Sequence, residues 1–545
     1  MATESESESA NEEFLGFDEE AQAAVFRPRE EESESDVSVS SVATEELSDS
    51  SESEEEDDDD QWNDNNNPVE VSPFTAATGP TWGVAEDGTA IDFFYLMFPE
   101  DLIEHIVSET NRFAQECIAA KPDPKWRETT LEEMKAFLGV HVLFGIKQLP
   151  ANHLYWSSDP LIGVPSVQKV MSRNRFDKLS QYFHLNNNAR QVPREDPRHD
   201  KLFKVRPVLD CVVENCKEKL RPGRNLSVDE AMVKFKGRLG MKQYLPMKPV
   251  KRGIKVWVCA EASSGYVCDF QVYTGKKQDG ATEQNLGYRV VHDLTRNFVG
   301  KNHHVFFDNF FSTVKLAEDL LKDGIYCCAT ARANRKDFPK DLAAKSPIVK
   351  RLKRGESIHR RKENVVATAW KDKKIVHFLS TQSNPIGNET VNRKQRDGTI
   401  IQVPSVPVVK SYNASMGGVD LHDQLRGYYS LGKKSKKWWR YLFWFVMDLS
   451  IVNAFILEKK AINHPSRTQL AFRIELAKDL IADFSSRQRS VCSGQVEGGH
   501  WPINSSRGRC KRCLKRKRTK FTMMACQSCE KRLCLECFPN HVGDV

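Results

Sequence analysis

Acidic residues at four positions stand in sequence contexts that favour metal-dependent chemistry. Asp229 lies at the entrance to a β-rich region, Asp308 directly follows a short apolar run, and Asp420 and Asp423 follow two glycines. A carboxylate at the end of an apolar strand lies where an α/β sheet presents its chemistry. Mg²⁺ prefers hard oxygen ligands with positions left open for water and phosphate, and a pair of such ions can support cleavage of a phosphodiester. The pattern therefore predicts a metal-dependent site that acts on phosphodiesters.

The same acids have a structural alternative. Aspartate is common at strand ends and helix N-caps, and the two glycines before Asp420 can mark a turn and nothing more. If this stretch is helical, the offset of three places Asp420 and Asp423 on one helix face. The spacing alone leaves both interpretations open.

Six of the fourteen cysteines fall in the last 36 residues, as three C-x-x-C pairs. Each pair lets two thiolates reach one tetrahedral Zn²⁺, and three pairs with nearby histidines can fill two sites. So short and polar a segment needs the metal for much of its stability. The expected ligands of two Zn²⁺ ions are His500, Cys510, Cys513, Cys526, Cys529, Cys534, Cys537 and His541.

How these ligands divide between the two Zn²⁺ ions depends on the arrangement of the fold, and several arrangements are possible. A cross-brace, as in RING- and PHD-like folds, places the first and third cysteine pairs at one ion. The second pair then shares the other ion with His541 and His500. The alternative for His500 is a solvent-facing position in the preceding linker.

Basic and aromatic residues mark two candidate DNA contacts. Lysine and arginine neutralise phosphates, and tryptophan can stack on an unpaired base or wedge between bases. Residues 507–520 hold nine cations and are also a candidate nuclear localisation signal. One of the two adjacent tryptophans, 438 and 439, is expected in the core of the helix that begins there. The predicted contacts are Trp438, Lys436, Lys437, Arg440, Lys515, Arg516, Lys517 and Arg518.

The formal charge of +5 conceals a segregation of charge along the chain. Residues 1–60 carry 24 acidic and two basic side chains, a net −22, and the remaining residues carry 78 basic and 51 acidic groups, a net +27. A basic body suggests a polyanion partner. Ser33, Ser51 and Ser53 each precede an acid by three residues, a pattern that acidophilic kinases favour. A merely solubilising role for the acidic segment is the alternative.

Composition excludes several classes of protein. A hydrophobic content of 39% supports a packed body, and no apolar run follows Met1. Residues 441–457 are too short and too polar for a comfortable membrane span, so we expect a buried helix there and no membrane partner. C-x-x-C pairs without a secretory signal predict metal rather than disulfides, in a reducing compartment. We expect a nuclear protein.

The elements that must position the acids can be predicted from hydrophobic periodicity. Helical spacing dominates residues 90–221 and returns over 418–482. Strands are expected over 254–260, 266–273, 305–307 and 325–330, with a helix over 313–321. Residues 332–400 read as a basic, loop-rich insertion.

Three blocks of this sequence, taken together, resemble the piggyBac-type DDE/D transposases. The matching segments are 227–230, 234–238, 244–246, 248–249 and 253–257 for the first block, 307–312 for the second and 417–423 for the third. The resemblance runs in order from about residue 90 onward. It implies an α/β protein with an RNase H-like catalytic core, flanked by all-α segments for dimerisation and DNA binding. An insertion domain and a small C-terminal zinc-binding domain complete it.

Composition and the resemblance together give the expected boundaries. These are a disordered acidic region at 1–88, helical segments at 89–222 and 427–485, core segments at 223–331 and 407–426, an insertion domain at 332–406, a linker at 486–499 and a cysteine-rich domain at 500–545.

What the resemblance implies about function is specific. Asp229, Asp308 and Asp420 would bind Mg²⁺ or Mn²⁺ as a catalytic triad, with Asp423 a nearby fourth acid. In the resembling family, a tryptophan on the helix after the third aspartate acts near the cleavage point. The spacing from Asp420 matches Trp438 better than Trp439. The partners implied are double-stranded DNA, at terminal inverted repeats and TTAA targets, and further copies of the chain. The reaction implied is a nick, hairpin formation and strand transfer.

The sequence is also compatible with two other functions. A domesticated, non-catalytic DNA-binding protein could have kept the scaffold, although it has no need of the intact acids. A chromatin reader working through a PHD-like terminal segment would leave the acid-bearing core without a role.

Overall fold

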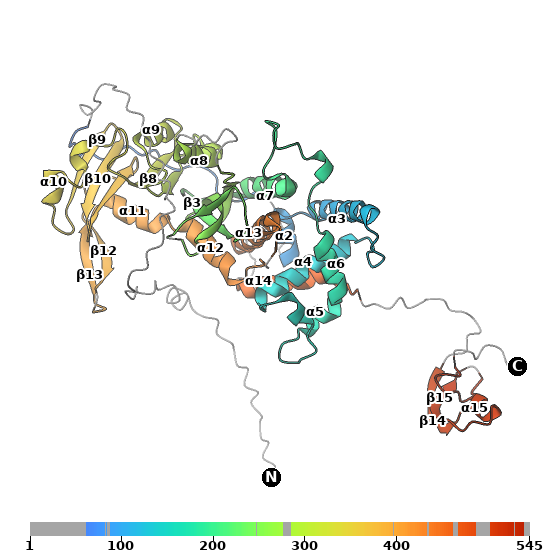
Figure 1. Ribbon diagram of the computed structural model, residues 1–545. Coiled ribbons are helices and arrows are strands. Elements are labelled where there is room, and N and C mark those ends of the chain that lie inside the picture. Colours follow the sequence, from blue (N-terminus) through green and yellow to red (C-terminus); the bar gives the residue numbers. More distant parts are fainter. Residues whose placement is uncertain are drawn as a thin grey trace, which may run out of the picture. The chain divides into compact units, whose positions relative to one another are not determined.

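The computed structural model describes residues 62–81, 83, 88–246, 248–275, 285–395, 397–432, 435–461, 467–486, 502–527 and 529–538. Within these ranges the chain forms a mixed sheet with helices packed against it, followed by a small cysteine-rich segment (Figure 1).

A nine-stranded sheet positions Asp229 and Asp308, whereas Asp420 and Asp423 lie on a helix. Eight strands follow the order β4-β5-β3-β7-β8-β11-β10-β9, and β6 pairs with β5. β3 runs parallel to β7 and β7 parallel to β8, whereas the other neighbours are antiparallel. β3, β5 and β7 are almost entirely buried, which explains the apolar runs of β5 and β7. The strands are β3 (Asn225–Lys234), β4 (Lys242–Tyr244), β5 (Arg252–Glu261), β6 (Val267–Val272), β7 (His304–Phe307), β8 (Tyr326–Ala331), β9 (Ser357–Lys362), β10 (Val365–Lys371) and β11 (Ile375–Ser380).

Helices precede, interrupt and follow the strands of the sheet along the chain. The described helices are α2 (Ala90–Met97), α3 (Glu100–Ala120), α4 (Leu131–Ile146), α5 (Pro165–Val170), α6 (Arg173–Tyr182), α7 (Arg206–Glu218), α8 (Leu286–Thr295), α9 (Val314–Lys322), α10 (Pro347–Lys350), α11 (Pro407–Ser415), α12 (Gly418–Tyr428), α13 (Trp438–Lys460) and α14 (Gln469–Ile481). Short 3₁₀ turns and the two-stranded pair β1 (Gly79–Pro80) and β2 (Leu220–Arg221) connect them.

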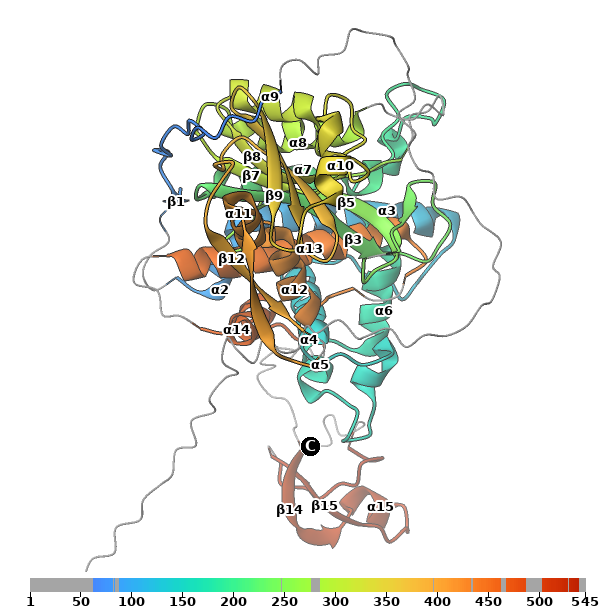
Figure 2. The ribbon, with the colours of Figure 1, turned by 90° about the vertical axis from the view of Figure 1, so that its left-hand side faces the viewer.

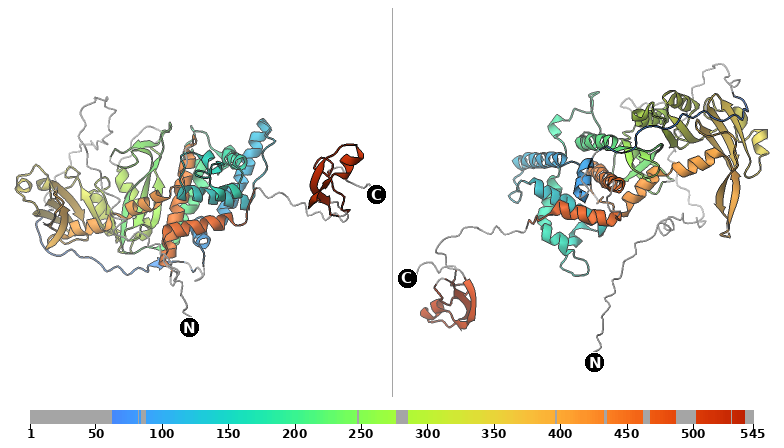
Figure 3. Two further views of the ribbon diagram at one scale, coloured as in Figure 1. Left: turned by 90° about the horizontal axis from the view of Figure 1, so that it is seen from below. Right: turned by 180° about the vertical axis from the view of Figure 1, so that it is seen from behind.

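The long helix α13 forms the centre of the helical part. It contacts α2, α7, α12 and α14 and reaches β3 of the sheet (Figure 3). Among the described residues it is the one helix long and apolar enough to span a membrane, but 94% of its apolar window is buried inside the fold. The expectation of a buried helix over residues 441–457 is therefore confirmed.

The predicted loop-rich insertion requires a correction. Residues 357–380 form β9, β10 and β11, which continue the central sheet beyond β8 rather than interrupt it with loops. Of the cations in this stretch, Arg360, Arg361 and Lys362 lie on the edge strand β9, while β10 is apolar and buried. A second hairpin, β12 (Glu389–Lys394) with β13 (Ile400–Ser405), follows and leads into α11 (Figure 2).

The predicted disordered region also requires a correction at its end. Residues 62–74, called the N-terminal strap from here on, lie against the sheet instead of forming free coil. Its polar backbone finds partners at the exposed edge of β9 and on neighbouring strands, which offsets the entropy of ordering a polar segment. Its contacts join Asn63 to Arg361, Val69 to Asn384, Ser72 to Tyr326 and Phe74 to His303. Residues 1–61, with the predicted kinase sites, lie outside the described residues.

The cysteine-rich segment is described by itself. β14 (Pro502–Arg509) pairs with β15 (Phe521–Cys526), and the short helix α15 (Lys511–Lys515) lies between them in sequence. Residues 487–501, which include most of the predicted linker at 486–499, lie outside the described residues.

Candidate active site and metal centre

Two of the predicted acids meet because their strands are parallel neighbours. Asp229 lies in the middle of β3, and Asp308 directly follows β7. The register pairs Val228 with Phe307, so the next residue on each strand is one of the two acids. Both therefore lie at the same level of the sheet.

A third carboxylate completes this group. Oxygen atoms of Asp229, Glu230 and Asp308 lie within 4.8 Å of one another. Three carboxylates at this spacing supply the hard oxygen donors that suit a divalent cation such as Mg²⁺. We call these three residues the acid cluster. Asp420 and Asp423 are not members of it at this spacing.

Asp420 lies on the first turn of α12, and its carboxyl interacts electrostatically with Lys248 and Asp229. The start of this helix packs closely on the sheet, because a Cβ on Gly418 would lie 2.5 Å from Ser227 Oγ and 2.9 Å from the Glu261 carbonyl oxygen. Further along the helix, the buried His422 donates from Nδ1 to the carbonyl oxygen of Gly265, at 3.0 Å. Gly418 is thus the first residue of a docked helix, not only part of a turn.

Two lysines face the acid cluster. Lys248 Nζ lies 2.9 Å from Asp229 Oδ2 and 3.9 Å from Glu230 Oε1. Lys255, on β5, is 7% exposed, and its ammonium lies 4.0 Å from the ring centre of Trp257 and 5.0 Å from that of Phe310. The carboxylates thus already attract cations, as a metal site requires.

The electrostatics of the cluster follow from burial and crowding. Burial, with repulsion from Asp229, raises the pKa of Glu230 to about 7, against the attraction of Lys255 and Lys248. Burial also raises the pKa of Asp308, although the Phe310 N–H opposes the shift by donating to Asp308 Oδ1 at 2.8 Å. Carboxylates that resist ionisation when crowded gain stability from a bound cation.

The cations near these acids respond in opposite ways. The pKa of Lys248 is raised because the carboxylates of Asp229 and Glu230 outweigh its partial burial. The pKa of Lys255 is lowered because burial outweighs the same carboxylates. Asp420 keeps solvent contact, yet partial desolvation and its acidic neighbours raise its pKa, against Lys248.

The loop that carries Asp308 is held from two directions. Arg335 donates to the carbonyl oxygens of Asn309 and Phe310, at 3.2 and 2.8 Å. Phe310 stacks on Trp257 with ring centres 5.3 Å apart. On the other side, Gly287 of α8 lies so close that a Cβ there would meet the Phe310 carbonyl oxygen at 2.9 Å. These contacts fix where the Asp308 carboxylate points.

The predicted DNA contacts after α12 divide into buried and accessible groups. Trp439 is 3% exposed and belongs to the core, whereas Trp438 is half-buried, so one of the two tryptophans is in the core as expected. Lys436 is exposed. Burial lowers the pKa of Lys437 to about 8, and its ammonium lies 5.4 Å from the ring centre of Phe113.

Arg440 differs from the prediction of an open phosphate contact. Its guanidinium donates to the Ser180 carbonyl oxygen and packs 5.4 Å from the ring centre of Trp439, and burial lowers its pKa to about 10. This arginine therefore ties α13 to the end of α6. The cations at 515–518 are all exposed.

Four cysteines of the terminal segment converge. The sulfur atoms of Cys510, Cys513, Cys534 and Cys537 lie within 4.8 Å of one another, and Cys513 Sγ is 3.7 Å from Cys534 Sγ and 3.6 Å from Cys537 Sγ. A tetrahedral Zn²⁺ with ~2.3 Å bonds to sulfur separates its ligands by about 3.8 Å. These cysteines could hold such an ion. Cys526 and Cys529 are thiols near the end of β15, and His500 and His541 lie outside the described residues.

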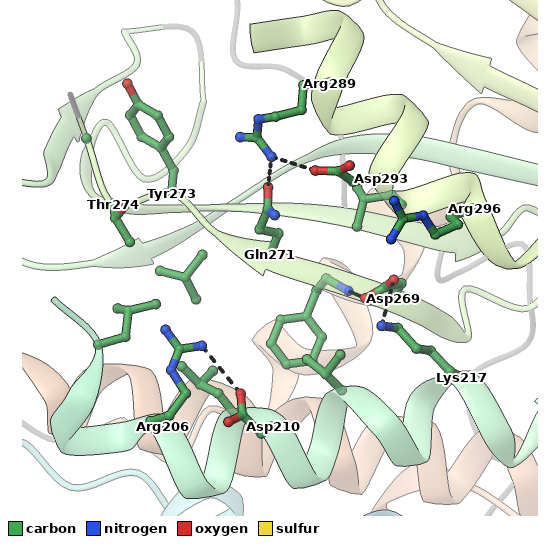
Figure 4. Close-up of a pocket in the computed structure, with 17 residues that line it drawn as sticks. Arg206, Asp210, Lys217, Asp269, Gln271, Tyr273, Thr274, Arg289, Asp293 and Arg296 are labelled. Carbon is green, nitrogen blue, oxygen red and sulfur yellow. Dashed lines mark hydrogen bonds and ion pairs between the residues drawn. The ribbon is translucent and has the colours of Figure 1, made fainter. Parts of the chain in front are cut away.

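A separate hollow of about 550 Å³ lies between α7, β6 and α8 (Figure 4). Ion pairs occupy its walls, and they join Arg206 to Asp210, Lys217 to Asp269 and Arg289 to Asp293. Burial raises the pKa of Asp269 to about 6, against Lys217. None of the predicted catalytic acids lines this hollow, so the acid cluster is the better candidate for chemistry.

Sequence reasoning did not assign roles to Glu230, Lys248 or Lys255. Glu230 was visible only as the neighbour of Asp229, and neighbours on a strand normally face opposite ways. Lys248 belongs to the cation-rich run 248–252, which resembles any solvated surface. Lys255 was the clearer signal, because it is a cation within an otherwise apolar strand.

The sequence of this chain is similar to those of known transposase-related proteins. A family model described as Transposase IS4 matches residues 89–455. The human PiggyBac transposable element-derived protein 5 is 28% identical over 423 residues, covering 74% of this chain and 77% of that protein. The human PiggyBac transposable element-derived protein 2 is 29% identical over 464 residues, covering 79% and 73%.

A solved structure has a similar fold. The cryo-EM structure of the piggyBac transposase synaptic complex with hairpin DNA superposes with a TM-score of 0.64 at 23% identity, covering 85% of this chain and 100% of that chain. The mixed α/β fold described above is therefore that of a piggyBac transposase.

Proposed function

Because the chain belongs to the piggyBac-type transposase family, we propose that it is an active cut-and-paste DNA transposase. It would bind terminal inverted repeats, cleave the DNA strand, form a hairpin and transfer the strand into TTAA targets. The observation that carries this proposal is the acid cluster of Asp229, Glu230 and Asp308 on adjacent strands.

The strand arrangement supports an RNase H-like catalytic core. β5, β3, β7 and β8 lie side by side in that order, with β5 antiparallel to β3 and the others parallel. This places one acid within the central strand and one at the end of its parallel neighbour, at the switch between strand orders where ligands bind in such sheets.

Each acid has a proposed role. Asp229 and Asp308 hold Mg²⁺ or Mn²⁺, with Asp420 contributed by α12 and Glu230 beside them. Asp423 forms an ion pair with Arg426 on the same helix, with Arg426 Nη2 3.0 Å from Asp423 Oδ1. We therefore assign Asp423 a role in stabilising α12 rather than in binding the metal. When bound, the metal supplies charge stabilisation for phosphoryl transfer. The acids position the metal against the DNA strand, and the nearby lysines and arginines neutralise the phosphates of the DNA.

The DNA path is proposed from the accessible cations. Lys436 and Lys437 precede Trp438, which is half-buried and can present one edge to a base. The exposed Lys515, Arg516, Lys517 and Arg518 form a second contact on the terminal segment. We propose a Zn²⁺ at Cys510, Cys513, Cys534 and Cys537, and a second Zn²⁺ that involves Cys526 and Cys529. The protein would act in the nucleus, as a dimer or larger assembly on paired ends.

A second function has a specific argument in its favour. The human relatives above are named as transposable element-derived proteins. A domesticated DNA-binding protein without catalysis would keep the scaffold and the basic surfaces but would not depend on the acid cluster.

Excision from a donor plasmid separates the two functions. The plasmid carries the inverted repeats that flank the coding sequence in the genome, and repaired donors are sequenced for restored TTAA. Asp308→Asn should abolish excision, whereas Asp293→Asn, an aspartate outside the cluster, should retain it. Absence of excision by the unaltered protein would favour the domesticated function. Excision by Asp308→Asn would refute the acid assignment.

A further inference from the structure

Lys248 differs from the other cation at the acid cluster in how it is held. Lys255 lies within β5, and its ammonium is cradled by Trp257 and Phe310, so it has little freedom to leave. Lys248 lies in the loop between the three-residue strand β4 and β5, and a quarter of its side chain is exposed. Only Lys248 can move away without disturbing a central strand.

The ammonium of Lys248 lies beside the acid cluster, where a positive charge can offset the repulsion between the carboxylates. Its ammonium lies 2.9 Å from Asp229 Oδ2 and 3.9 Å from Glu230 Oε1, in contact with two of the three members of the acid cluster. Three carboxylates within 4.8 Å repel one another strongly when partly buried. An ammonium at this point relieves the repulsion, but it also competes with a divalent ion for Asp229.

We propose that Lys248 is a resident counter-ion of the acid cluster, which it holds together in the metal-free protein and releases when a divalent cation binds. This inference rests on the proposed metal-dependent function. Lys248 is a positioning residue here, because it acts through Asp229 and Glu230. It sets the affinity of the cluster for metal and prevents the acids from separating before the metal arrives.

In Lys248→Met, we expect the unfolding temperature of the metal-free protein to fall and the affinity for Mn²⁺ to rise. The metal-free protein should unfold at a lower temperature, because the acids lose their counter-ion. The affinity for Mn²⁺ should rise at least about tenfold, because removal of a unit charge near 4 Å is worth more than ~1.4 kcal/mol at the effective dielectric of such sites. Lys248→Arg, which keeps the charge, should stay near the unaltered protein in both.

Mn²⁺ binding can be measured without DNA, on the full chain, by electron paramagnetic resonance of the free ion at pH 8. The matched control is Lys251→Met, an exposed lysine three residues along the same loop. It should change neither observable.

The outcomes distinguish this proposal from the proposed function. If the unaltered protein binds Mn²⁺ and Lys248→Met binds it with the same or lower affinity, the counter-ion role is wrong while the metal site stands. A metal-free unfolding temperature unchanged in Lys248→Met would also overturn it. If the unaltered protein binds no Mn²⁺ beyond that bound by Asp229→Asn, the metal site fails and this inference fails with it.

Discussion

Gly418→Ala should disturb catalysis by moving the helix that carries Asp420. The backbone of Gly418 does not require a positive φ, so alanine is conformationally acceptable there and the effect is steric. A Cβ would lie 2.9 Å from the Glu261 carbonyl oxygen and 3.0 Å from Ala262 Cα, both backbone atoms that cannot rotate away. Reaching ordinary contact at 3.4 Å requires a shift of about half an ångström.

The magnitude follows from this displacement. Since a misplacement of 1 Å can cost about 100-fold in rate, half of that shift should cost about tenfold. Overpacking should also lower the stability by about 1–3 kcal/mol, partly offset by the better helix propensity of alanine. Ser227→Ala removes the nearest side-chain atom but leaves the two backbone contacts, so it should rescue Gly418→Ala only in part.

The neighbouring glycine supplies the control. A Cβ on Gly417 meets nothing within 4 Å, so Gly417→Ala should retain full activity. The assay is the rate of strand cleavage at saturating end DNA, with the unfolding temperature measured on the same preparations. Equal rates for the two variants would refute the claim that the close approach of α12 to the sheet positions Asp420.

Three further predictions address other parts of the chain. Cys534→Ser should lower the zinc content by about one ion per chain, measured by elemental analysis, whereas Cys117→Ser should not; an unchanged zinc content would refute the four-cysteine site. Asp448→Asn should lower the free energy of unfolding by roughly 3–5 kcal/mol, measured by thermal unfolding, because the fully buried Arg473 loses its carboxylate partner at 3.3 Å and keeps the neutral Tyr429 carbonyl oxygen. Asp448→Leu with Arg473→Met should recover much of the loss, and equal stability of the single and double variants would contradict this. Burial lowers the pKa of His184 to about 4, so the folded protein binds fewer protons than the unfolded chain between pH 6.5 and 4. The free energy of unfolding should therefore fall as the pH falls through that window, and less steeply in His184→Gln. The same pH dependence in both proteins would refute this role of His184.

The sequence predicted the elements of the core because their apolar runs are strong. β5, β6, β7, α9 and β8 lie where periodicity placed them, within a few residues. The predicted meeting of Asp229 and Asp308 required that β3 and β7 be parallel neighbours, which no local pattern encodes. That expectation came from the family resemblance, and the register of Val228 with Phe307 now gives it a physical basis.

Other features depend on long-range packing and escaped prediction. The N-terminal strap has the composition of coil and is ordered only because the edge of β9 offers backbone partners. Likewise, β9 carries Arg360 and Arg361, whose charges suggested a loop although the strand is paired along its whole length with β10. Glu230 and Lys248 became visible as members of the site only through distances.

The charge segregation leads to one more expectation. If the segment with net −22 competes with DNA for the basic body, deletion of residues 1–60 should raise the affinity for nonspecific DNA at low salt and have less effect at high salt. Fluorescence anisotropy across a salt series measures this. Equal affinity of the two proteins would return the segment to a solubilising role.

Mg²⁺-dependent nicking of terminal-repeat DNA by the purified protein tests the role of the acid cluster directly. We expect strand cleavage that requires the divalent ion and falls at least about 100-fold in Asp229→Asn and Asp308→Asn, with DNA binding retained. Binding without cleavage by the unaltered protein, or cleavage that survives either substitution, would contradict the assignment of the acid cluster as the catalytic centre.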